Sequence, residues 1–174
     1  LKQAPQWFSS LENNLRSFSE KYLWTALTSN KDLRKISGGR MINYILNDIE
    51  NIKQGKGQPG APGKTENKLS VLTVPQAVLA AFVSAFAPKG TKIGNKELDA
   101  SSLYPGAGAL HIIELHEDKS KWNVKILYRN SHTEQLKPMT LPSCSDNCSY
   151  DSFKSMLEKY NMKKEDHDKL CKGS

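Results

Sequence analysis

The stretch Lys68-Leu-Ser-Val-Leu-Thr-Val-Pro-Gln-Ala-Val-Leu79 decides how the chain is organised. Its apolar, partly β-branched residues 69–74 predict a buried strand. Pro75-Gln76 ends that strand, and an apolar helix is predicted over residues 78–86. In open α/β sheets, ligands bind where a strand passes into a helix at its carboxyl end. Pro and Gln at this turn carry no group that moves a proton, so the place suits a binding site without catalytic chemistry.

The length and charge of the chain limit its class. A length of 174 residues predicts one domain or slightly more, with enough chain to bury a core. The formal net charge of +7 makes anionic surfaces such as heparin-like glycans plausible partners. Basic residues do not alternate with aromatic ones, and no apolar run reaches roughly 18 residues, so we expect neither nucleic acid nor a membrane as partner. The chain begins at Leu1 without a signal-peptide pattern, and we expect a processed or trimmed product.

Three cysteines indicate the cellular setting. Cys144 and Cys148 are four positions apart, with no His or further Cys at the spacing of a zinc site. We therefore predict a small disulfide loop in a secreted protein, and no metal. Cys171 is then without a partner in the sequence. Three interpretations of it stay open: an intermolecular disulfide, a bond to a cysteine missing from this chain, or a free thiol. Asn147 begins a glycosylation sequon inside the loop, where we expect it to be a poor acceptor.

Two amphipathic helices are predicted in the first part of the chain. Residues 7–28 carry an apolar stripe that predicts helix packing: Trp7, Leu11, Leu15, Phe18 and Tyr22. Trp24 lies off this stripe, so it packs elsewhere or lines a cavity. After a polar connector over residues 29–35, Gly38-Gly39 is expected to open a helix over residues 40–52, with the glycines serving close backbone packing. The predicted core face of that helix is Met41, Ile42, Ile45, Leu46 and Ile49.

Two segments between these elements are predicted to be loops. Residues 53–68 are rich in Gly, Pro and Lys and predict a mobile surface loop or a processing site. Gly63-Lys-Thr65 is not a phosphate-binding loop, because Gln58 stands where the first Gly is required and a strand is predicted to follow. We expect no cofactor. Residues 88–109 predict a long loop that returns towards the strand ends.

The last third predicts a hairpin and a helix. Residues 110–116 and 122–129 alternate in polarity around a short charged turn, which is typical of an antiparallel hairpin. His111 and His116 fall on opposite faces of the first strand, so they cannot share a metal, and structural roles are predicted for both. An amphipathic helix is predicted over residues 149–160. The charged tail that follows is expected to be held only through Cys171.

Three motifs resemble the animal histidine acid phosphatases of the prostatic and lysosomal type. Residues 37–51 are similar to the helix that precedes the catalytic strand in that family. Residues 110–115 and 124–130 are similar to its late hairpin, and residues 139–149, with Phe153 after them, to its C-terminal disulfide loop and helix. The resemblance implies an α/β chain that forms the C-terminal half of a histidine-phosphatase (phosphoglycerate-mutase-like) fold. It further implies a helical cap segment over residues 1–36 and a part of the α/β core over residues 37–174.

The resemblance also implies what the chain lacks. The half with the Arg-His-Gly motif and the nucleophilic His is not in this sequence, and we expect it as a companion chain, disulfide-linked through Cys171. Family members carry His-Asp after the strand that corresponds to residues 69–74, with Asp as the general acid and His holding the phosphate. Pro75 stands at the His position and Gln76 at the Asp position. A general acid contributes roughly 10²–10⁴-fold, so we expect no phosphatase activity.

With Pro75 and Gln76 at these positions, the chain resembles the acid-phosphatase-like proteins of flea saliva that lack catalytic residues. That family is associated with sequestering biogenic amines and leukotrienes. The resemblance therefore implies a secreted salivary protein that binds a small amine, such as serotonin, or an eicosanoid. An arylethylamine needs aromatic walls, a polar anchor and an acceptor for its ammonium. We predict ligand contacts from Trp24, Pro75, Gln76 and Tyr104. Two alternatives stay open: a residual acid phosphatase acting on phosphomonoesters, and a protein that binds anionic glycans through its Lys-rich surface.

Overall fold

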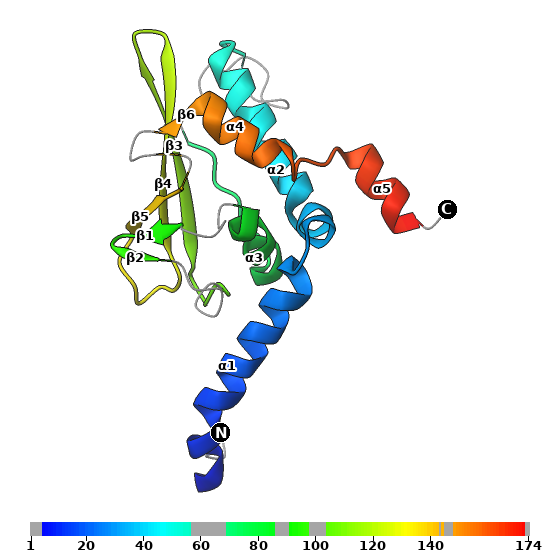
Figure 1. The fold of residues 1–174 in the computed structure, drawn as a ribbon, viewed down its shortest axis with the longest axis vertical. Helices are drawn as coiled ribbons and strands as arrows, with labels where there is room; N and C mark the ends of the chain where they lie inside the picture. The colour runs from blue at the N-terminus through cyan, green and yellow to red at the C-terminus, as the bar shows by residue number, and fades with distance from the viewer. Residues whose placement is uncertain are drawn as a thin grey trace.

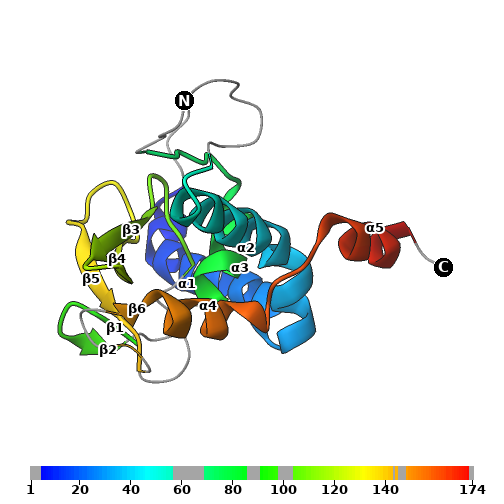
Figure 2. The ribbon, with the colours of Figure 1, turned by 90° about the horizontal axis from the view of Figure 1, so that it is seen from above.

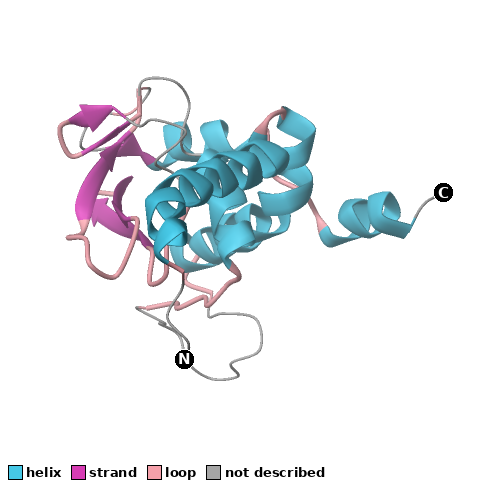
Figure 3. Cartoon of the chain, turned by 90° about the horizontal axis from the view of Figure 1, so that it is seen from below, coloured by secondary structure: helices cyan, strands magenta, loops and turns pink. Residues whose placement is uncertain are grey.

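The computed structural model describes residues 5–56, 69–85, 91–97, 104–142, 144 and 148–172. In this part of the chain, helices gather beside a curled antiparallel sheet, and the last helix stands apart from them (Figures 1 and 3). The mixture of helices and sheet confirms the predicted α/β class. None of the described helices is long and apolar enough to cross a membrane. Residues 57–68, most of the predicted Lys-rich loop, lie outside the described residues.

Helix α1 (Gln6–Thr28) confirms the first predicted helix, but its apolar stripe does not pack as expected. The five side chains of the stripe are between 45% and 69% exposed. The cause is the position of the helix, which extends away from the rest of the molecule through most of its length (Figure 1). Only its last turns enter the core, where Trp24 and Thr28 are buried.

Helix α2 (Lys31–Lys53) begins nine residues before the predicted start at residue 40. The sequence signal for this start is Asn30, whose Oδ1 accepts a hydrogen bond from the Leu33 N–H at 2.8 Å. Gly38 and Gly39 therefore lie within the helix, and the prediction that they open it was wrong. The prediction that the two glycines serve close packing of the backbone agrees with the structure, since both are buried. The predicted boundary between residues 36 and 37 falls inside α2, and the division into cap and core stays a prediction.

Residues 69–75 contradict the predicted buried strand. They form no regular structure, and Leu69 and Val71 are 79% and 77% exposed. A strand needs a neighbour for its backbone N–H and C=O groups, and the described residues place none beside this segment. The helix predicted after it is confirmed as α3 (Gln76–Ala85). Phe82 and Val83 are among its buried side chains and belong to the hydrophobic core. The helix itself packs beside α2 (Figure 2).

The sheet has the strand order β2-β1-β5-β4-β3, with β6 (Cys148–Ser149) also paired to β4. Strands β3 (Leu110–Asp118) and β4 (Lys121–Arg129) confirm the predicted hairpin over its full length. Strands β1 (Lys92–Ile93) and β2 (Lys96–Glu97) form a small hairpin inside the segment predicted as a loop. Pairing of β1 with β5 (Lys137–Thr140) explains this correction, because a short polar strand is stabilised by a neighbour distant in sequence.

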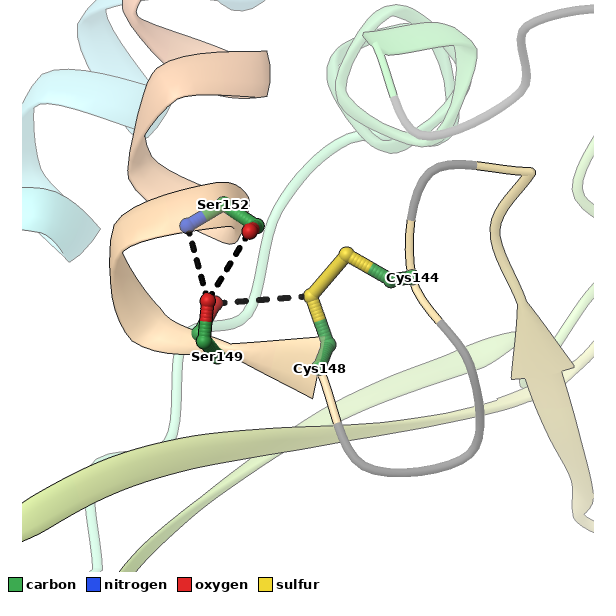
Figure 4. The surroundings of a disulfide bond; sticks show 4 residues. All are labelled: Cys144, Cys148, Ser149 and Ser152. Atoms are coloured by element: carbon green, nitrogen blue, oxygen red, sulfur yellow. Dashed lines mark hydrogen bonds between the residues drawn. A yellow bond between two sulfur atoms is a disulfide. The ribbon is translucent and has the colours of Figure 1, made fainter.

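The C-terminal elements follow the disulfide. Strand β6 (Cys148–Ser149) leads into α4 (Tyr150–Glu158), which confirms the last predicted helix. The Ser149 Oγ accepts a hydrogen bond from the Ser152 N–H at 3.2 Å and caps α4 beside the disulfide (Figure 4). The predicted loose tail is instead helix α5 (Lys164–Lys172), whose first turn carries acidic residues that favour a helix N-terminus.

One hydrophobic core joins α2, α3, α4 and one face of the sheet. The predicted core face of α2 is confirmed, with three of its residues buried and the other two packed against the core. Fully buried apolar side chains come from all these elements: Ile42, Phe82, Val83, Val124, Tyr128, Tyr150, Phe153 and Leu157. The core therefore fixes α3, and with it the turn at its start, against the sheet.

Candidate functional site

An open groove runs along one face of α1, from Phe8 to Leu23, and is bordered by the start of α3 and by Tyr104. Its volume is about 380 Å³. It is lined by a mixture of aromatic, aliphatic, charged and amide side chains: Phe8, Glu12, Leu15, Arg16, Ser19, Glu20, Leu23, Gln76 and Tyr104. We call this feature the α1–α3 groove. Its volume falls within the range of small-molecule sites, and both polar and apolar side chains line it.

Gln76 is held at the edge of the α1–α3 groove by two prolines. The carbonyl oxygen of Pro75 accepts hydrogen bonds from the N–H groups of Val78 and Leu79, at 3.0 and 3.1 Å, so the helix starts at this turn. A proline is tolerated there because the first helical turn does not use its missing N–H. The Gln76 Nε2 donates a hydrogen bond to the carbonyl oxygen of Pro105. This bond fixes the start of α3 against the loop that carries Tyr104.

The charges in the α1–α3 groove favour a cation. Glu12 Oε1 accepts a hydrogen bond from Arg16 Nη2 at 2.9 Å, within α1. Glu20 lies about two turns further along the helix. In the part of the chain that the structure describes, Glu20 forms no ion pair. Two carboxylates against one guanidinium make the groove attractive to an ammonium group and unfavourable for a phosphate.

The structure brings together two of the four predicted ligand residues. Gln76 and Tyr104 both line the α1–α3 groove, and Pro75 forms the turn directly before Gln76. Trp24 is buried in the core and does not line this groove. It helps to hold the last turns of α1 against the other helices. The ligand contacts themselves stay a prediction.

Sequence reasoning missed the part of the groove that α1 supplies. Phe8, Glu12, Ser19 and Leu23 recur at four- or seven-residue steps, which places them on one face of a helix. The signal was present, but the neighbouring aromatic stripe dominated the helix pattern. No sequence rule places this face of α1 next to a residue of α3, because that contact depends on the tertiary fold.

The histidines occupy the structural positions that were predicted. The His111 ring lies edge-on to Phe82, with 5.2 Å between ring centroids, and burial lowers the pKa of His111 to about 3. His116 lies on the exposed face, with Nε2 3.1 Å from Glu114 Oε2. Among the residues that the structure describes, no group of His, Cys, Asp or Glu could hold a metal ion.

Two of the three cysteines form the disulfide that their spacing predicted, and the third is a free thiol. Cys144 and Cys148 form a disulfide with an S–S length of 2.06 Å, and Figure 4 shows it beside the start of α4. Cys171 carries an exposed free thiol on α5, 3.8 Å from the His167 ring nitrogens. A second, smaller cavity of about 170 Å³ lies between the disulfide, β4 and β5. Its lining is mostly apolar and includes neither Gln76 nor Tyr104.

Comparison with known proteins places the chain in a family. No family model matches it. It is 43% identical over 163 residues to the acid phosphatase-like protein XcAP-1 of the flea Xenopsylla cheopis, which covers 94% of this chain and 44% of that protein. It is 39% identical to XcAP-3 of the same flea, over 99% of this chain and 47% of that protein. Prostatic acid phosphatase of Rattus norvegicus is 25% identical over 88% of this chain and 36% of its own length.

The chain thus spans about half the length of the curated relatives that it matches. Its helices and curled sheet are consistent with an α/β fragment of the histidine acid phosphatase fold, as the sequence motifs implied. Along nearly its whole length, this chain belongs with the flea acid phosphatase-like proteins and is more distantly related to the prostatic and lysosomal acid phosphatases.

Proposed function

We propose that this chain is part of a secreted acid phosphatase-like protein that has lost phosphatase activity and binds a biogenic amine in the α1–α3 groove. The observation that carries the proposal is the composition of that groove. Gln76, from the turn where the resemblance expects a general acid, lines it together with Glu20 and Tyr104. An amide, an acidic side chain and aromatic rings are the groups that an arylalkylamine requires.

The turn at the start of α3 supports the loss of catalysis. Neither Pro75 nor Gln76 has a proton to transfer to a leaving oxygen. The Gln76 amide is engaged with the Pro105 carbonyl oxygen instead. Glu12 and Glu20 are the other acids of the groove, and their charge repels the phosphate that they would have to protonate.

Amine binding follows from the charges and the rings. An ammonium group placed by Glu20 gains a charge-assisted contact with a carboxylate that forms no ion pair within the described part of the chain. Tyr104 offers aromatic surface to the ring of the ligand. The Gln76 side chain keeps an acceptor oxygen for a ring hydroxyl. An eicosanoid carries a carboxylate of its own, so the groove favours the amine of the two expected ligand classes.

The cysteines support secretion and a companion half. The disulfide between Cys144 and Cys148 is typical of an oxidising compartment, and saliva is the setting that the resemblance to the flea proteins implies. Cys171 is exposed and able to bond a cysteine outside this chain. We propose that this cysteine belongs to the other half of the same fold. The intact mass before and after reduction tests the bond, because loss of a second polypeptide on reduction is the expected result.

Isothermal titration calorimetry with serotonin tests the amine site. The titration uses the 174-residue chain, which supplies Glu20, Gln76 and Tyr104 of the α1–α3 groove. Saturable heat with serotonin, together with no turnover of 4-nitrophenyl phosphate at acid pH, is the expected result. A leukotriene titrated in parallel separates the two ligand classes. Absence of heat with serotonin overturns the amine proposal, and clear hydrolysis supports the residual-phosphatase alternative.

A further inference from the structure

Helix α1 carries a continuous apolar stripe whose side chains are exposed in the part of the chain that the structure describes. Its side chains are Trp7, Leu11, Leu15, Phe18 and Tyr22, and each is at least 45% exposed. The stripe runs for about 22 Å along the helix, at 1.5 Å per residue. The rings of Phe18 and Tyr22 stack on one another, with 6.5 Å between centroids. Contiguous apolar surface of this kind marks a binding face, because folded monomers rarely expose it.

The segment before α3 is uncovered as well. Leu69, Val71 and Leu72 are exposed, and the segment has no strand partner among the described residues. It ends at Pro75, directly before the groove residue Gln76. The carboxyl end of this segment therefore lies beside the α1–α3 groove. Exposed apolar side chains on the segment and on the stripe both support a partner outside this chain.

The stripe is distinct from the face of α1 that lines the groove. With 3.6 residues per turn, the centre of the stripe and the centre of the groove face are roughly 100° apart around the helix. Leu15 belongs to both, so it marks their common edge. A partner on the stripe would therefore form a rim of the groove and leave Glu20 and Gln76 accessible.

We propose that the stripe docks an apolar face of the half of the acid phosphatase-like fold that this chain does not contain. The size of the missing part supports this occupant. Matches that cover 94% and 99% of this chain reach only 44% and 47% of the two flea relatives, so more than half of each relative lies outside the match. The inference rests on the proposed companion half. It is independent of amine binding, because docking is measured without ligand.

Co-expression tests the docking surface. The probe is the part of XcAP-1 that this chain does not match, produced together with the full 174-residue chain. Size-exclusion chromatography with light scattering is expected to show a 1:1 complex. The double substitution Leu11→Asp with Phe18→Asp is expected to weaken association by at least about 100-fold, since two apolar side chains lose their burial. Both side chains are exposed in this chain, so circular dichroism is expected to show an unchanged fold.

The matched control is Asn13→Asp, an exposed position on the opposite side of α1. It adds one negative charge to the helix, half of what the double substitution adds, and is expected to leave the complex intact. Three results overturn the proposal: no complex with the unsubstituted chain, equal association of the doubly substituted chain, or a homodimer that the double substitution disrupts. The last result would assign the stripe to a second copy of the chain. Intact-mass analysis reports separately whether a companion half is bonded to Cys171.

Discussion

The side-chain Nε2 of Gln76 donates a hydrogen bond to the carbonyl oxygen of Pro105, which couples the start of α3 to the loop of Tyr104. We predict that Gln76→Ala weakens serotonin binding by roughly 2- to 10-fold, because a hydrogen bond contributes about 0.5–1.5 kcal/mol. Both the anchor and the position of Tyr104 are lost in this variant. Calorimetry measures the change in Kd, and Gln135→Ala, at an exposed position far along the chain, is expected to leave Kd unchanged.

Glu20 tests the electrostatic part of the amine proposal. We predict that Glu20→Gln raises the Kd for serotonin by roughly 10- to 100-fold, since hydrogen bonds to charged groups contribute about 1.5–3 kcal/mol. The affinity of the unsubstituted chain should also fall with added salt, and that of the variant should respond less. Glu165→Gln, which removes an exposed carboxylate from α5, is the control. Equal affinity of the Glu20 and Glu165 variants would remove Glu20 from the site.

The elements that sequence patterns predicted correctly are those stabilised within this chain. The β3–β4 hairpin has strong alternation and a two-residue turn at Lys119-Ser120, where both φ values are positive. The helix over residues 149–160 has a single apolar stripe and a Ser cap. In both cases the local sequence pattern and the tertiary packing favour the same structure, so the pattern alone was sufficient to predict the element.

The wrong predictions share a different cause. The pattern of residues 69–74 is that of a strand, and the stripe of α1 is that of a packed helix. Both features have apolar side chains and no cover in the described part of the chain. A sequence pattern reports that a residue prefers burial, but it does not report which polypeptide buries it. For Trp24 the pattern left two alternatives open, packing elsewhere or lining a cavity, and the structure places it in the core.

Gly39 tests the close packing of α2. A Cβ at this position would lie 2.5 Å from the carbonyl oxygen of Tyr160 and 2.8 Å from the Met162 Cβ. We predict that Gly39→Ala lowers the free energy of unfolding by up to about 2 kcal/mol. Overpacking costs about 1–3 kcal/mol, and the better helix propensity of Ala offsets about 1 kcal/mol of it. Urea denaturation followed by circular dichroism measures the difference.

Gly38 supplies the graded comparison for this variant. Its added Cβ would lie 3.1 Å from the backbone carbon of Ala81, a looser contact than that at Gly39. Gly38→Ala should therefore cost less than Gly39→Ala. The opposite order of the two free energies would show that the contact between α2 and the Tyr160 turn does not determine the packing of this helix.

His111 makes the stability of the fold depend on pH. Burial of its ring nitrogens lowers the pKa in the folded chain to about 3, against 6.5 for an unperturbed His. Between these values the unfolded chain binds the proton and the folded chain does not, so stability falls as the pH decreases from 6.5 towards 3. Between pH 7 and pH 5 this group should reduce the free energy of unfolding by about 2 kcal/mol. Urea denaturation at both pH values measures the loss.

The variant His111→Phe should remove this contribution and make the difference between pH 7 and pH 5 smaller by the same amount. Phe82→Leu provides the control, because it alters the ring contact with His111 and leaves the imidazole in place. That control should lower stability at both pH values and keep the pH dependence of the unsubstituted chain. If His111→Phe keeps the full pH dependence, another group titrates over this range, and the buried imidazole is not the cause of the acid sensitivity.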